Sequence, residues 1–71
     1  MNVKEYLERF NHRRHIPARY YAYRIGITSH AVGLSEVEAR KRARLSMSPN
    51  VDSRYIREGV ADAYKTQRST Q

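Results

Sequence analysis

The chain has 71 residues and a formal net charge of +7, because eleven arginines and three lysines face only seven acidic residues. Leu, Ile, Val and Phe together supply 13 residues, so the composition predicts one small domain whose core is completed by alanine and tyrosine. The lack of cysteine excludes disulfides, thiol catalysis and cysteine-based zinc sites. No apolar run is long enough for a membrane span or a signal peptide, and we expect a cytoplasmic protein with no membrane partner.

The first predicted helix covers residues 2–14, in which four apolar residues follow helical spacing. These are Val3, Tyr6, Leu7 and Phe10. Asn2 and Glu5 have the spacing of a capping pair at the start of this helix. Pro17 disfavours helical geometry at the residue before it, so the helix ends near His15 and Pro17 begins the next one.

A helix-turn-helix is predicted within residues 22–32. Ala22 suits a close crossing of two helices, and Gly26 can adopt the positive φ that ends a helix. The segment resembles the DNA-reading unit of small phage repressors of the Cro type, which run Ala-x-x-Leu-Gly-Ile-Ser-x-x-Ala-Val. The resemblance implies that the second helix begins with the residues that contact a DNA groove. These are Thr28, Ser29 and His30.

The same stretch also fits a β-strand. Residues 20–28 alternate large apolar and other side chains in β-favouring types, so a strand there would make the fold α+β instead of all-α. This alternative has a function of its own. Residues 53–60, which read SRYIREGV, resemble the second helix of ribbon-helix-helix repressors, and residues 24–28 would then supply the ribbon.

A third helix is predicted over residues 34–46, where Ser35 and Glu38 have capping-box spacing. This helix has two apolar faces. One is a stripe into which Lys41 can lay its aliphatic stem, and the other is a narrow alanine face suited to close helix contact. The stripe consists of Leu34, Val37 and Leu45, and the alanine face of Ala39 and Ala43.

The last predicted helix runs from Asp52 or Ser53 to about residue 66, after a loop at residues 47–50. Its inner face carries Ile56, Val60 and Ala63, and Gly59 allows a close approach of another helix. The prediction is therefore a single helical domain of three to four helices over residues 1–66, followed by a disordered tail at residues 67–71.

Two clusters of basic residues are candidate binding sites. The first, on the third helix, is expected to contact phosphates, and its alternative is a solvated helix face balanced by local acids. The second, around the end of the first helix, is expected to contact a protein partner, and its alternative is stabilisation of a helix C-terminus. The clusters are Arg40, Arg42 and Arg44, and Arg13, Arg14 and Arg19.

These features predict a small basic transcription regulator of phage or plasmid type that binds duplex DNA. The alternative is a protein-binding inhibitor or modifier of host RNA polymerase, because an arginine-rich surface can dock on an acidic protein as well as on DNA. We expect no enzyme, because the sequence holds no phosphate-binding glycine loop and no nucleophile elbow. We expect no cofactor, and no metal site either, because His12 and His15 lack a third ligand at suitable spacing.

Overall fold

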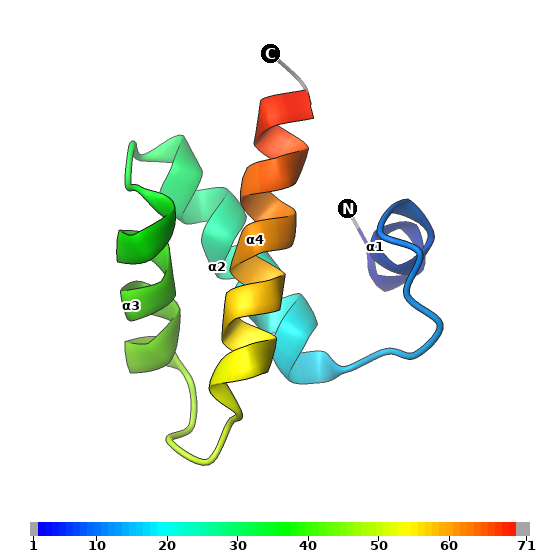
Figure 1. The fold of residues 1–71 in the computed structure, drawn as a ribbon, viewed down its shortest axis with the longest axis horizontal. Helices are drawn as coiled ribbons and strands as arrows, with labels where there is room; N and C mark the ends of the chain where they lie inside the picture. Colours follow the sequence, from blue (N-terminus) through cyan, green and yellow to red (C-terminus); the bar gives the residue numbers. More distant parts are fainter. Residues whose placement is uncertain (1, 70–71) are drawn as a thin grey trace.

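The computed structural model describes residues 2–69, which form four helices. These are α1 (Val3–Arg9), α2 (Pro17–Ala31), α3 (Glu36–Ser46) and α4 (Ser53–Ser69). α2 and α4 run in the same direction and cross at the centre (Figure 1). α3 runs back along one side of this pair and contacts both helices, and α1 lies on the other side (Figure 1). Within the described residues there is no strand, so the all-α prediction is confirmed and the strand predicted at residues 20–28 is wrong.

The centre of the fold is a close crossing of α2 and α4 that we call the small-residue seam. It consists of Ala22 and Gly26 on α2, and Gly59 and Ala63 on α4. A β-carbon placed on Gly59 would lie only 2.8 Å from the Ala22 β-carbon and would meet the Arg19 carbonyl. Both alanines of the seam are fully buried. The close approach predicted at Gly59 is therefore confirmed, and it lets two helices pack where large apolar residues are scarce.

The turn predicted at Gly26 is wrong, because α2 continues through this residue to Ala31. Gly26 is buried against Val60 and Ala63 of α4, so its missing side chain serves helix packing. The helix ends instead at Gly33, which has a φ of +87°. The Gly33 amide donates to the His30 carbonyl at 3.0 Å, and the next amide donates to Ser29 at 3.0 Å, which is the hydrogen-bond pattern of a Schellman motif.

The predicted starts of the first three helices are confirmed. The Asn2 side chain accepts from the Glu5 amide at 2.8 Å, and Pro17 occupies the first turn of α2. At the start of α3, the Ser35 hydroxyl accepts from the Glu38 amide at 3.2 Å, and the Glu38 carboxylate accepts from the Ser35 amide at 3.1 Å. Both halves of the predicted capping box are therefore present.

Two predicted helix ends are wrong. α1 stops at Arg9, five residues before the predicted Arg14, because Asn11 adopts a φ of 60° and closes the helix as glycine does elsewhere. α4 continues to Ser69, so the first part of the predicted tail at residues 67–71 is helical. Residues 70 and 71 lie outside the described residues.

A cluster of aromatic rings joins α1 to the rest of the fold. Tyr6 is 1% exposed, and its ring centroid lies 4.7 Å from that of Tyr23 and 5.4 Å from that of Tyr20. Phe10, at the C-terminal end of α1, packs beside Tyr6 at 5.3 Å. Tyrosine thus fills the part of the core that the few large aliphatic residues leave open.

Candidate docking surface on helix α3

α3 packs through its alanine face and leaves its other apolar stripe outside. Ala39 and Ala43 are fully buried, whereas Val37 is 51% exposed and Leu45 is 88% exposed. Lys41 lies between these two at helical spacing, so the three residues form one exposed strip. We call this strip, Val37, Lys41 and Leu45, the outer face of α3. It combines apolar side chains with a cation and has no covering element among the described residues.

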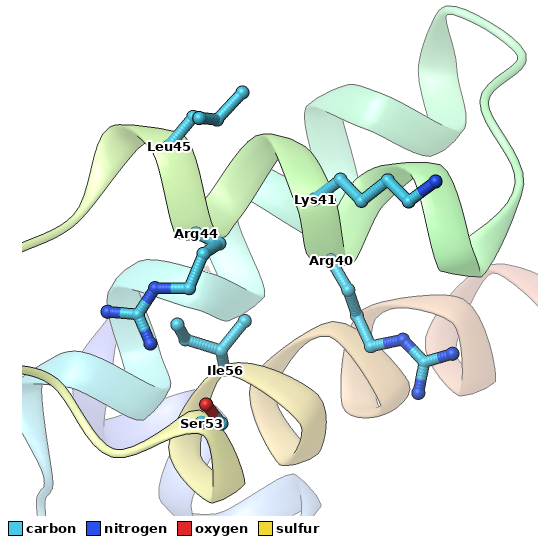
Figure 2. A pocket seen from close by; sticks show the side chains of 6 residues that line it. All are labelled: Arg40, Lys41, Arg44, Leu45, Ser53 and Ile56. Carbon is cyan, nitrogen blue, oxygen red and sulfur yellow. The ribbon is translucent and has the colours of Figure 1, made fainter. Parts of the chain in front are cut away.

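An open hollow of about 480 Å³ lies beside the outer face, between α3 and α4. Figure 2 shows Arg40 and Arg44 extending from α3 toward α4, with Ile56 of α4 between them. Leu45 points away from α4, and Ser53 marks the start of that helix (Figure 2). The hollow is lined by Arg40, Lys41, Arg44, Leu45, Ser53 and Ile56.

Among residues 2–69, no ion pair neutralises the basic side chains of this region. No acidic side chain is among the residues that line the hollow, as far as the described chain extends. Arg44 donates to the main-chain carbonyls of Ser48 at 2.6 Å and Val51 at 2.8 Å, which fixes its guanidinium but leaves its charge unpaired. The side chains of Arg40 and Arg42 make no hydrogen bond or ion pair with any residue between 2 and 69.

The nearby acid Glu38 is committed to the helix cap. Its hydrogen bonds with the backbone and side chain of Ser35 hold the pKa of its carboxyl below the ordinary value. The charge of Glu38 therefore stabilises the N-terminus of α3, where a carboxylate is favoured by the helix dipole. The basic residues in the middle and second half of α3 remain available to an anionic partner.

The residues predicted to begin a recognition helix lie elsewhere in the fold. Thr28, Ser29 and His30 occupy the last turns of α2, because the turn falls after them. Ser29 is fully buried and its hydroxyl has no hydrogen-bond partner in the described structure. The His30 ring packs edge-on against Tyr64 at 5.1 Å, and only Thr28 is exposed. The prediction that these residues start an exposed helix is therefore wrong.

The second predicted cluster is divided by the fold. Arg13 and Arg14 are exposed in the loop between α1 and α2. Arg19 instead points inward, where its guanidinium is paired with Glu58 of α4, and its side chain is 16% exposed. Only the two loop arginines are thus free to contact a partner.

A partly buried polar network holds this part of the fold together. The Arg19 guanidinium lies 3.0 Å from His12 Nδ1, and because guanidinium groups only donate, Nδ1 accepts this hydrogen bond. His12 Nε2 then donates to Asp62 at 3.2 Å, and the Tyr6 hydroxyl donates to the same carboxylate oxygen at 2.7 Å. Burial, followed by the contact with Asp62, raises the pKa of Tyr6. Both nitrogens of His12 are occupied, so it offers no lone pair to a metal or substrate.

Sequence reasoning identified the arginines of α3 but missed the hollow beside them. The available signal was the Leu34, Val37 and Leu45 stripe, together with a competing alanine face on the same helix. Which face turns inward depends on how α4 packs, and this is a long-range property. Because Ala39 and Ala43 face inward, the Val37 and Leu45 side of α3 is left outside, beside the hollow.

Comparison with protein-family models, with curated proteins and with solved structures found no significant match for this chain. In the described part of the chain, no helix is both long enough and apolar enough to cross a membrane. The function is therefore argued from the surface of α3 itself.

Proposed function

We propose that this protein is a non-enzymatic binding protein that docks on an acidic surface of another protein through the outer face of α3. The observation that carries the proposal is Leu45, which is 88% exposed in a chain with only 13 large aliphatic or phenylalanine residues. Leu45 continues a strip with Val37, which is 51% exposed, and an exposed apolar strip on a basic helix face points to a partner that covers it.

The chemistry of the surface favours a protein over DNA as the partner. Phosphates interact favourably with the cationic side chains only. Leu45 and Val37 contribute binding free energy only when they are buried against apolar side chains or methyl groups. An acidic protein surface with interspersed apolar residues complements both properties of α3. Host RNA polymerase in the cytoplasm is the partner class that we propose, in keeping with the small size and the net charge of +7.

The proposal is tested by titrating the protein into transcription reactions with host RNA polymerase, beside gel-shift assays on the same templates. We expect transcription to change on promoters that share no common sequence, without a shift of the DNA at physiological salt, where binding through charge alone is weak. A Leu45→Glu variant should lose this effect, because it places a charge in the apolar contact. A Thr28→Glu variant, altered at an exposed site on α2, serves as the matched control.

Duplex DNA remains a second candidate because of one observation. A tight turn with Gly33 at φ +87° joins α2 to α3, and α3 then presents several unpaired basic residues. Such a helix could enter a groove while Arg40, Arg42 and Arg44 contact phosphates. Inhibition that appears only together with a DNA shift, and that fails for the triple alanine variant of these arginines, would favour this candidate over protein docking.

A further inference from the structure

We infer that the hollow between α3 and α4 seats an acidic segment of the protein partner, with one large apolar side chain over Ile56 and a carboxylate at Arg40. This inference rests on the proposed function and names the site at which docking occurs. The bound segment is a peptide stretch that is acidic and carries one exposed apolar side chain.

The floor of the hollow is suited to an apolar anchor. Ile56 is 3% exposed and lies between the aliphatic stems of Arg40 and Arg44 (Figure 2). The volume of about 480 Å³ falls within the roughly 300–1,000 Å³ range of ligand-binding clefts, so a large side chain has room to enter. A bound DNA duplex would leave the hollow filled with water, because the DNA backbone has no apolar group long enough to reach Ile56.

The rim of the hollow is suited to carboxylates. Arg40 has no partner within the described residues, so a carboxylate can form a bidentate pair with it. Arg44 is already ordered by the carbonyls of Ser48 and Val51, which reduces the side-chain entropy lost when a partner binds. A second copy of this chain is a poor occupant, because it would bring the same excess of positive charge.

The probe is a synthetic peptide with one leucine flanked by glutamates, titrated into the isotope-labelled protein. We expect the Ile56 methyl resonances to shift most, and replacement of the peptide leucine by alanine to weaken binding at least about tenfold. In the protein, Ser53→Trp should weaken binding by a similar factor, because the indole fills the hollow from an exposed position.

Arg42 is the matched control for testing whether the positive charge of Arg40 contributes to binding. Both are unpaired arginines on α3, but only Arg40 lines the hollow. We expect Arg40→Glu to weaken peptide binding about tenfold or more, and Arg42→Glu to change it by no more than about twofold. Helicity and melting temperature of each variant confirm that the fold is kept, and the peptide substitutions test the site in the unaltered protein.

Several results would overturn the inference. Equal losses for Arg40→Glu and Arg42→Glu would show binding by overall charge. An unaffected Ser53→Trp variant, or leucine-free peptides that bind equally well, would show that the hollow stays empty. Larger Ile56 shifts with a DNA duplex than with the peptide would assign the hollow to nucleic acid. If Leu45→Glu abolishes the effect on polymerase while Ser53→Trp does not, the proposed docking through α3 is supported, and only the assignment of the bound segment to the hollow is wrong.

Discussion

Gly26 of α2 faces Ala63 of α4 so closely that a β-carbon on Gly26 would lie 2.6 Å from the Ala63 β-carbon. The α-carbon of Val60 would lie 3.3 Å away, so the contact on this side includes backbone that cannot turn aside. The two helices are therefore held at a separation that only a residue without a side chain permits.

We expect Gly26→Val to destabilise the fold by about 2–3 kcal/mol or more, because the added side chain must push α2 and α4 apart. Urea unfolding followed by circular dichroism measures the loss. An unchanged midpoint would show that the two helices are not in close contact at this point.

Gly33→Ala provides the comparison, because this substitution causes backbone strain and no steric clash. A β-carbon on Gly33 would meet no atom within 4 Å, but its φ of +87° is unfavourable for alanine. We expect a loss of about 1–2 kcal/mol from backbone strain alone. The same unfolding assay ranks the two variants, and a larger loss for Gly33→Ala would contradict the packing described for the small-residue seam.

Tyr6 makes the free energy of unfolding depend on pH in the alkaline range. Its pKa is raised by burial and by Asp62, so the folded protein keeps the phenolic proton that the unfolded chain releases near pH 10. The contribution is therefore full below about pH 10 and is lost as the pH rises further. Denaturation midpoints at rising pH should fall less steeply for Tyr6→Phe, which lacks the ionisable group. A variant with the same pH slope as the natural protein would remove Tyr6 from this role.

The capping box makes the stability of the first turn of α3 depend on pH in the acidic range. The pKa of Glu38 is lowered in the folded state, so its contribution is present above about pH 4.3 and is lost as the pH falls below that value. We expect the Cα chemical shifts of the first turn of α3 to move toward coil values on acidification. Glu38→Gln should weaken this response, whereas Ser35→Ala should loosen the turn at every pH by about 1 kcal/mol.

The excess of positive charge predicts weak DNA binding that carries no sequence preference. With a net charge of +7, the protein should shift any duplex at low salt and release it as salt rises, because counterions compete for the phosphates. Gel shifts on unrelated duplexes across a salt series measure this. A complex with one duplex that survives at high salt would support the DNA candidate instead.

Local signals in the sequence predicted where helices begin. Asn2, Pro17 and Ser35 act within three or four residues of themselves, and each is found at its predicted helix start. The turn was misplaced because Gly26 and Gly33 look alike in sequence. One is needed for a close helix approach and the other for a positive φ, and only the position of α4 distinguishes them.

The site was predicted only in part for the same reason. The arginines of α3 stand out by composition, but Arg19 is withdrawn from the surface by Glu58, 39 residues away in the chain. Likewise, the choice between the alanine face and the Val37–Leu45 strip depends on α4. Contacts between distant residues thus decide which basic side chains and which apolar stripe a partner meets.

The small-residue seam also determines how relatives of this protein can be sought. Gly26 and Gly59 have no smaller replacement, and Ala22 and Ala63 have only glycine, so almost every change in the seam enlarges a side chain, which the packing opposes. The surface arginines and the outer face of α3 have no such constraint from the fold. Distant members of the lineage should therefore keep two pairs of small residues, each four positions apart, long after the rest of the sequence has diverged.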